Sequence, residues 1–261
     1  NFRCPSLAVG AGEGQTYSMI QLNPLADDDP LLDQSRLFHA LERTIRYAEA
    51  NSGIGLTQTK LFNRKFAHWG AQNFNWPDYS EEKLLRVQKV LNEEDVPPVM
   101  VIHDVLTIAK WGRHVKGKFQ LSKSLKTLAA HRGQLFEEFA QQYLFRYNHG
   151  RLSRIDFTAP GNWDIWLNII NVEAQQGLTE AHLVKTLYGL EQPTDPFDRE
   201  YRNHQWFLVS EVLRPLVWIG FLEETRETDD RLPDRIYWKA PLWSKCLALD
   251  TDHYLSEPTK H

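Results

Sequence analysis

The sequence predicts a mainly α-helical protein with small β-hairpins, arranged as two similar halves. Three observations lead to this prediction. Apolar residues recur at spacings of three and four along most of the 261-residue chain, as one face of an amphipathic helix requires. Two stretches, within 112–121 and 221–239, change to strand-like spacing around polar turns. The tripeptide Gly-Leu-Thr occurs at 55–57 and at 177–179, each time between helical segments.

Bulk composition is that of a folded protein, with 42% hydrophobic and 25% charged residues. Cys4 and Cys246 are the only cysteines. They form neither a zinc site nor a disulfide framework by themselves, so we expect a reducing, cytoplasmic compartment. No apolar run approaches the roughly 20 residues of a membrane helix, and the first residues lack the pattern of a secretory signal. We therefore expect no membrane association.

Charge divides the chain into three parts. Residues 1–32 carry one basic and four acidic residues and are interpreted as an N-terminal arm. Residues 33–150 form a basic first half, with 17 basic and 12 acidic residues. Residues 151–261 form an acidic second half, with 12 basic and 18 acidic residues. The formal net charge of −4 argues mildly against general nucleic-acid binding, but the basic first half does not.

The first half predicts helices within 31–53, 55–74, 76–98 and 99–111. Asp33, Thr57 and Ser80 are the expected N-cap residues of the first three, because their side-chain oxygens can accept from free backbone amides. Gly53 stops the first helix, Pro97 and Pro98 break the third, and Gly112 closes the fourth. A hairpin turning at Lys-Gly-Lys follows, then helices from Ser122 and within 133–147.

The second half repeats this order after a linker over 148–162. A helix within 162–176 precedes a short helix capped by Thr179, and a loop over 191–200 precedes a helix that closes at Gly220. A strand, a polar loop, a strand and a helix then occupy 221–249. Because the context matches on both sides of each Gly-Leu-Thr, we interpret the halves as a duplicated module.

This order of elements resembles the winged helix-turn-helix superfamily. The similar residues run from Gly55 to Leu125, including "VLTIAKWGRHVKGKFQLSKSL", and from Gly177 to Trp243, including "RIYWKAPLW". The resemblance implies tandem winged-helix-like modules, in which a helix enters the DNA major groove and the hairpin, or wing, touches the backbone. The first copy has an extra helix between its Gly-Leu-Thr helix and its wing, so the identity of its reading helix stays open.

The candidate nucleic-acid contacts lie in the first half. Between Lys110 and Lys126 the chain has six basic residues and a histidine but no acid, and such a cluster can neutralise phosphates. The Gly-Leu-Thr helix adds three more cations, with Lys60 expected on the same helical face as Arg64. An ordinary solvated surface is the alternative. The full set is Lys60, Arg64, Lys65, Lys110, Arg113, His114, Lys116, Lys118, Lys123 and Lys126.

The second wing differs in charge. It holds Glu223, Glu224, Glu227, Asp229, Asp230 and Asp234 against three arginines. Phosphates would be repelled there, so the second module is expected to pack on the first, to form a homodimer or to contact a protein partner.

Sequence motifs for enzymatic chemistry are absent. The chain has no phosphate-binding loop, no dinucleotide-binding turn and no metalloprotease helix motif. A resemblance to a nuclease cluster lies in Asp78, Glu81, Glu82 and Lys83, where acidic residues also suit a helix start. We expect no catalytic residue, metal ligand or cofactor.

The leading hypothesis is therefore a bacterial-type, non-enzymatic regulator whose first module binds double-stranded DNA. The alternative is a protein-interaction or assembly module of the same fold without DNA affinity. A metal-dependent nuclease is a third hypothesis. Salt dependence separates the first two, because phosphate contacts weaken steeply with salt.

Overall fold

The structure is a computed structural model that describes residues 20, 22–153, 155–226 and 235–256. It is mainly helical with small antiparallel sheets, as the sequence predicts. In order, the first half contains η1 (Pro30–Gln34), α1 (Arg36–Ala50), β1 (Ile54–Gly55), α2 (Arg64–Asn73), η2 (Pro77–Tyr79), α3 (Glu81–Leu85), η3 (Glu93–Asp95), α4 (Pro97–Ile108), β2 (Gly112–Val115), β3 (Lys118–Leu121), α5 (Lys123–Leu128) and α6 (Arg132–Phe145). The second contains η4 (His149–Leu152), α7 (Trp163–Glu173), β4 (Leu178–Thr179), α8 (Glu180–Tyr188), α9 (Arg199–Phe207), the π-helical η5 (Leu208–Leu213), α10 (Arg214–Ile219), β5 (Leu222–Arg226), β6 (Arg235–Lys239), α11 (Pro241–Cys246) and α12 (Asp252–Ser256).

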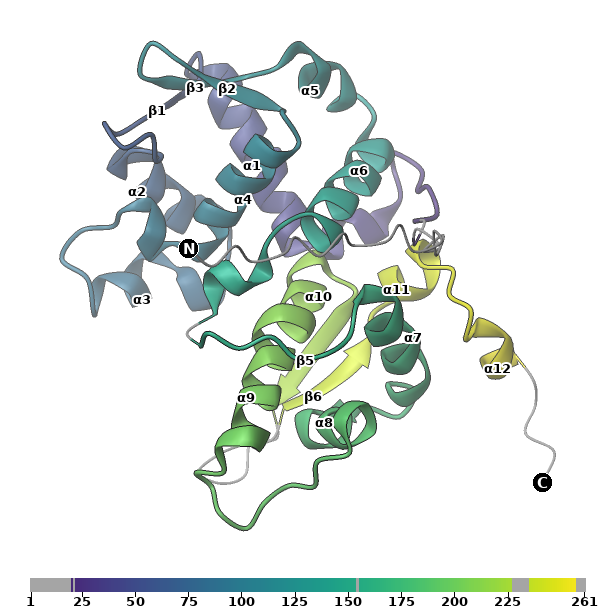
Figure 1. The fold of residues 1–261 in the computed structure, drawn as a ribbon. Helices are drawn as coiled ribbons and strands as arrows, with labels where there is room; N and C mark the ends of the chain where they lie inside the picture. Colours follow the sequence, from purple (N-terminus) through teal and green to yellow (C-terminus); the bar gives the residue numbers. More distant parts are fainter. Residues whose placement is uncertain (1–19, 21, 154, 227–234, 257–261) are drawn as a thin grey trace, which may run out of the picture.

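The two halves have the same strand topology (Figure 1). In the described residues each half has a three-stranded antiparallel sheet, ordered β1-β3-β2 in the first half and β4-β6-β5 in the second. Ile54 pairs with Phe119, and Leu178 pairs with Tyr237. All four side chains are buried, so equivalent strand pairs cover the core in both halves.

The two Gly-Leu-Thr stretches are not structural equivalents. Gly177 lies between α7 and β4 with φ +89°. Gly53 has the equivalent position between α1 and β1, with φ +103°. Each glycine precedes a fully buried strand residue, Leu178 or Ile54. Gly53 and Ile54 are therefore the structural equivalents of Gly177 and Leu178. The first Gly-Leu-Thr begins two residues after this equivalent position, at Gly55.

The ends of the helices that precede the two hairpins do correspond. Gly220 closes α10 in the left-handed conformation, and Lys110 takes the same conformation after α4. In both halves the following residue donates its backbone N–H to a carbonyl of the preceding helix. Trp111 donates to Leu106 O at 2.8 Å, and Phe221 donates to Leu216 O at 2.8 Å. Gly112, expected to close the helix, instead lies in β2.

Some helix starts differ from the sequence prediction. Asn63, not Thr57, caps α2, because the chain pairs in β1 and turns before the helix begins. Thr57 holds that turn by accepting from Leu61 N–H at 3.1 Å. Ser35 rather than Asp33 caps α1. Thr179 caps α8 as predicted.

The helix predicted within 76–98 is much shorter. Ser80 caps α3 as expected, but α3 ends at Leu85. Of the apolar residues expected to face inward, Leu91 is buried, whereas Val87 is 80% exposed. Pro97 occupies the first position of α4, where its missing N–H costs no helical hydrogen bond.

A single apolar core joins the two halves. Helix α10 packs against α1 and α6 of the first half, and Trp218 meets Trp76 edge to face at 4.7 Å between ring centroids. Leu22 and Leu25 are also buried. They belong to the described part of the expected arm, which therefore packs on the body; residues 1–19 lie outside the described part.

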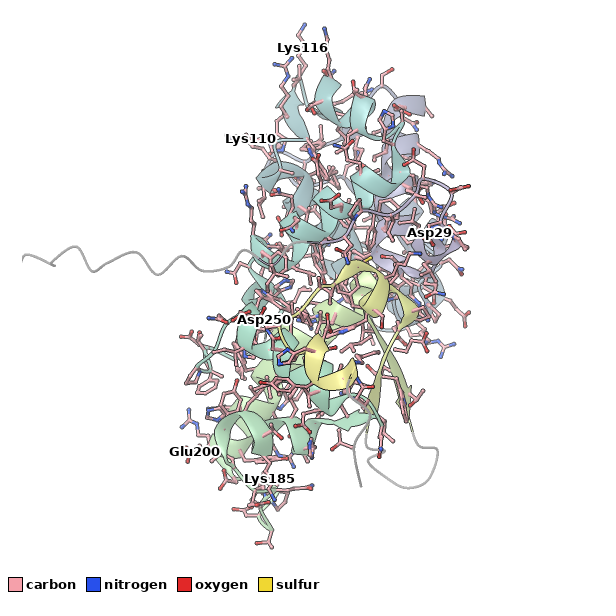
Figure 2. The ribbon with its side chains drawn as sticks, turned by 90° about the vertical axis from the view of Figure 1, so that its right-hand side faces the viewer. Asp29, Lys110, Lys116, Lys185, Glu200 and Asp250 are labelled. Carbon is pink, nitrogen blue, oxygen red and sulfur yellow. The ribbon has the colours of Figure 1, made fainter. Side chains whose placement is uncertain are left out.

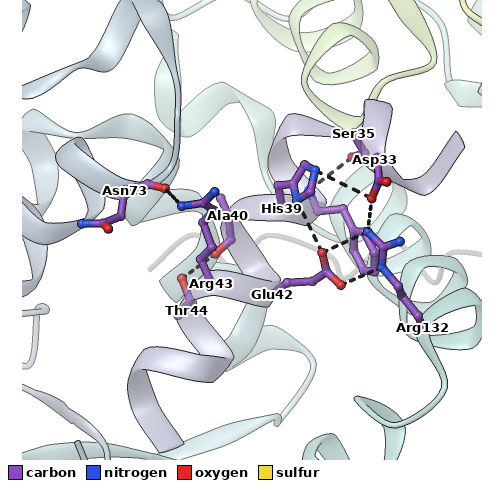
Figure 3. Close-up of polar contacts among 10 residues, drawn as sticks. Asp33, Ser35, His39, Ala40, Glu42, Arg43, Thr44, Asn73 and Arg132 are labelled. Atoms are coloured by element: carbon purple, nitrogen blue, oxygen red, sulfur yellow. Dashed lines mark hydrogen bonds and ion pairs between the residues drawn. The ribbon is translucent and has the colours of Figure 1, made fainter. Parts of the chain in front are cut away.

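Arg132 ties the start of α6 to the first helical segments (Figure 3). Its guanidinium donates to Glu42 at 2.8 and 3.2 Å and also to Asp33. The hydrogen bond from Arg132 lowers the pKa of Asp33. The Glu42 side chain is only 11% exposed, and His39 Nδ1 lies 3.5 Å from its carboxylate.

Replacing Arg132 by Met is expected to lower the free energy of unfolding by about 2 kcal/mol, because a nearly buried carboxylate loses its hydrogen-bonded cation. Urea denaturation measures the loss. Arg86→Met is the matched control, since its partner Glu82 is 81% exposed and such pairs contribute little. Equal losses in the two variants would contradict the role of burial.

Candidate nucleic-acid interface

The β2–β3 hairpin projects a basic turn into solvent. Its two turn residues have positive φ, 47° at Lys116 and 77° at Gly117. This combination fits a type I′ turn, whose twist matches that of paired antiparallel strands. Lys116 lies at one end of the elongated molecule in Figure 2. The hairpin therefore presents its tip away from the body.

Register separates the two faces of the hairpin. Arg113 pairs with Gln120, and both are exposed. His114 pairs with Phe119, which is buried against the core. Because cross-strand partners share a face of the sheet, Arg113 faces outward, and His114, although also exposed, lies on the side toward α4.

Exposed cations surround this hairpin without acidic partners. Lys116 is in the turn, Lys110 precedes β2, and Lys123 and Lys126 are on α5. Among the described residues, no ion pair involves these lysines or Arg113. Some exposed bases elsewhere are paired, for example Lys83 with Asp78 at 3.3 Å and Lys185 with Glu191 at 2.7 Å, whereas no ion pair in the described residues involves exposed Lys89 or Arg199. The hairpin end thus has uncompensated positive charge.

Two predicted contacts are engaged within the protein. Lys118 is half-buried and donates to the backbone carbonyl of Asn51 at 2.9 Å. Arg64 donates through Nε to Asn92 Oδ1 at 2.9 Å, although it remains exposed. Lys118 therefore supports the hairpin base, while Arg64 keeps other donors toward solvent.

The structure separates Lys60 from the helix that bears Arg64 and Lys65. Lys60 lies in the turn before α2 with φ +67°. The expectation that Lys60 and Arg64 share a helical face is therefore wrong, since α2 begins only at Arg64. Lys60 instead lies near enough to His114 for its charge to lower the pKa of that imidazole.

Helix α4, which directly precedes the hairpin, is buried. Its sequence, "PPVMVIHDVLTI", is apolar along most of its length. Its buried residues are Pro98, Val99, Met100, Val101, Ile102, His103, Val105 and Leu106. Helix α4 therefore forms core, and its near-continuous apolar run was the sequence signal for this.

A polar cluster that no sequence pattern predicts lies beside the hairpin, with Glu93 and His103 buried and His114 exposed. Glu93 has a fully buried side chain, and its oxygens lie 2.9 and 3.1 Å from His103 Nδ1. His103 Nε2 lies 3.5 Å from His114 Nε2. Glu93 is the first of three consecutive acidic residues. No local pattern distinguishes it from its exposed neighbour Glu94.

His114 is thus a poor phosphate contact. Burial, the charge of His103 and the charge of Lys60 all lower its pKa. The ring also packs against Phe119, with centroids 5.6 Å apart. His114 is exposed on the α4 side of the hairpin, away from the outward face that carries Arg113.

The described part of the second hairpin holds two acids, Glu223 and Glu224, and three bases, Arg226, Arg235 and Lys239. Glu223 is exposed on β5. Arg235 on β6 lies 4.0 Å from Glu224 and 3.4 Å from Glu180 of α8. The predicted acids Glu227, Asp229, Asp230 and Asp234 lie outside the described residues.

The suggested nuclease cluster does not converge. Asp78 pairs with Lys83, whereas Glu82 pairs with Arg86 at 2.6 Å. Glu81 binds His68 at 2.6 Å and Gln72 at 2.7 Å, and these hydrogen bonds lower its pKa. Within the described ranges, no group of three or more His, Cys, Asp or Glu side chains is placed to hold a metal ion.

A groove of about 730 Å³ lies between the halves. Its size is within the range of small-ligand sites. Trp76 and Arg36 line it from the first half, and Trp218, Leu222 and Glu223 line it from the second. Because these residues are far apart in the chain, no local sequence pattern predicts the groove.

None of the described helices has the length and apolar character needed to cross a membrane.

Two family models match separate parts of the chain. Residues 33–134 match the Y4jL N-terminal domain family, and residues 153–241 match the y4jL C-terminal domain family. The "Uncharacterized protein y4jL" of Sinorhizobium fredii (strain NBRC 101917 / NGR234) is 33% identical over 185 residues. This alignment covers 70% of the present chain and 84% of the relative. No solved structure matches the chain.

Proposed function

We propose that this chain, which belongs to the Y4jL family, is a non-enzymatic regulator that binds double-stranded DNA through its first half. Each half is interpreted as a winged-helix-like module, because each has the order helix, strand, helices, two strands and helix. The sheet orders β1-β3-β2 and β4-β6-β5 support this interpretation.

The observation that carries the proposal is the unpaired positive charge at the first hairpin. Arg113, Lys116 and Lys123 are exposed, and no acidic side chain in the described part of the chain pairs with them. Phosphate oxygens are strong acceptors for such donors, and neutralising phosphates releases condensed counterions. The hairpin and α5 would therefore contact the DNA backbone.

Burial of α4 determines what kind of DNA binding we propose. In the winged-helix arrangement the helix before the wing supplies base contacts. In the first half that position belongs to α4, whose side chains form core. Backbone contact without base reading positions a protein but carries no sequence information. We therefore propose salt-dependent binding with little sequence preference by the first half.

A protein-interaction or assembly role remains the second candidate. The buried α4 favours it, because an apolar helix in the reading position removes the usual base contacts. Exposed Glu223 and the acidic character of the second hairpin favour contact with a basic protein surface rather than DNA.

The test is fluorescence anisotropy with a random DNA duplex across a range of salt concentrations. Arg113→Ala/Lys116→Ala/Lys123→Ala is expected to weaken binding and to reduce the salt slope by up to about 3, since each phosphate contact contributes about 0.9. The control removes three paired cations, Lys83, Arg86 and Lys185.

No binding by the wild-type protein at low salt would reject DNA binding and leave the protein-interaction role. Equal weakening in the two triple variants would show that net charge, not the hairpin surface, governs binding. Strong preference for one duplex sequence would contradict backbone-only contact by the first half.

A further inference from the structure

A buried carboxylate fixes the ring of His103 under the hairpin. The side chain of Glu93 is 0% exposed. It accepts from the backbone N–H of Phe62 and lies 2.9 Å from His103 Nδ1. The Phe62 ring stacks on the imidazole, with centroids 3.9 Å apart and planes 14° from parallel. His103 therefore has one available nitrogen, Nε2.

His114 of the hairpin meets that nitrogen head-on. The two Nε2 atoms are 3.5 Å apart, and the ring centroids are 5.8 Å apart. The centroid distance exceeds the Nε2–Nε2 distance by about two ring radii, so both nitrogens lie close to the line that joins the ring centres. One proton between them suits this geometry. A shared metal ion would need both lone pairs to converge at a point beside that line.

We propose that Glu93, His103 and His114 form a proton-dependent anchor that holds the β2–β3 hairpin on α4. The anchor is closed while one proton lies between the two Nε2 atoms. It opens when both imidazoles are protonated, because each Nε2 then carries a hydrogen and neither can accept. His103 and Glu93 are thus positioning residues for the basic hairpin, and this consequence for DNA rests on the proposed function.

Charges around the anchor set the direction of its pH dependence. The charge of Glu93 favours protonation of His114, whereas the charge of Lys60, in the turn before α2, disfavours it. Asp104 of α4 is balanced by Arg151 of η4, whose Nε is 2.9 Å from Asp104 Oδ2. The remaining contacts, Phe62 and Phe119, are uncharged.

These surroundings predict opening in acid. Burial, His103 and Lys60 lower the pKa of His114 from 6.5, so the closed form disfavours the second proton. Opening is therefore expected to increase as pH falls below about 6.5. Arg113 and Lys116 are on the same hairpin, so its release would also displace two of the proposed phosphate contacts.

Hydrogen exchange of the hairpin amides tests the anchor without DNA. Rates over 112–121, each divided by the unfolded-chain rate at the same pH, are compared at about pH 7.5 and pH 5.5. Because the closed form disfavours the second proton, the wild-type protein is expected to open several-fold more often at the lower pH. His114→Gln, which can donate to His103 Nε2 but takes up no proton, is expected to show less than a twofold rise.

His131→Gln is the matched control, because His131 is 62% exposed and lies outside the anchor. It should keep the wild-type pH response. An equal response in wild type and His114→Gln, or none in wild type, would overturn the anchor. If the exchange result holds but the protein binds no duplex at any pH, the anchor stands and the proposed DNA function fails.

Discussion

Acidification to about pH 4 is expected to lower the free energy of unfolding by about 3 kcal/mol through His149 alone. His149 is 8% exposed at the junction of the halves. Its ring packs edge-on against Tyr143 and Tyr147, with centroids 5.0 and 5.1 Å away. Desolvation lowers its pKa from 6.5 to about 4.

The sign follows from proton uptake. The unfolded chain binds a proton near pH 6.5, whereas folded His149 resists it until about pH 4. The stabilisation is therefore complete above about pH 6.5 and is lost progressively as pH falls toward 4. Below that value both states are protonated and the loss from this residue stops growing.

Urea denaturation of wild type and His149→Gln across this pH range measures the effect. Glutamine can still donate toward Leu144 O, which lies 3.3 Å from His149 Nε2, but it does not titrate. The difference between the two curves isolates the contribution of His149 from that of carboxylates such as Asp33. Because the pKa of Asp33 is lowered, its contribution to stability is lost only in more acidic solution. Parallel curves between pH 7 and pH 4 would contradict the prediction.

The second large effect is expected at Asn171, where Asn171→Ala should lower the free energy of unfolding by about 3 kcal/mol. Asn171 is 1% exposed. Its Oδ1 accepts from Trp243 Nε1 at 2.9 Å and from Lys239 Nζ at 3.1 Å. Its Nδ2 donates to Thr251 at 2.9 Å and to Asp252 at 2.8 Å.

Alanine removes all four hydrogen bonds and leaves the buried indole N–H of Trp243 without its acceptor. Equilibrium urea denaturation provides the measurement. Gln175→Ala is the control at the same end of α7, because Gln175 is exposed and makes a single bond, to Asn171 O. Equal losses of stability in the two variants would contradict the prediction that the buried Asn171 amide connects α7 to β6 and to the C-terminal segment.

The sequence correctly predicted features whose hydrogen bonds join residues only a few positions apart, such as helix caps and a tight turn. Thr179 and Ser80 cap α8 and α3 as expected, since each hydroxyl reaches an amide three positions ahead. The Lys116-Gly117 turn was likewise readable from turn preferences. Thr57 failed as a cap because pairing of β1 with β3, a distant contact, delays the helix until Asn63.

The candidate interface was only partly predictable. Its exposed cations, such as Arg113 and Lys116, follow from a basic run without acids. The register that places His114 on the α4 side of the hairpin depends on Phe119 being buried, which depends in turn on helices packed beneath the sheet. The buried carboxylate of Glu93 had no sequence signal, because burial is a property of the assembled core.

The sequence by itself determined the helical content, the repeated order of elements and the charge contrast between the halves, because these depend on periodicity, capping and composition within short windows. Only the tertiary structure decided that α4 is core, that α10 joins the two halves, and that Glu93, His103 and His114 meet. Those outcomes depend on which apolar faces find each other across the chain, and burial then fixes which polar side chains are left to pair.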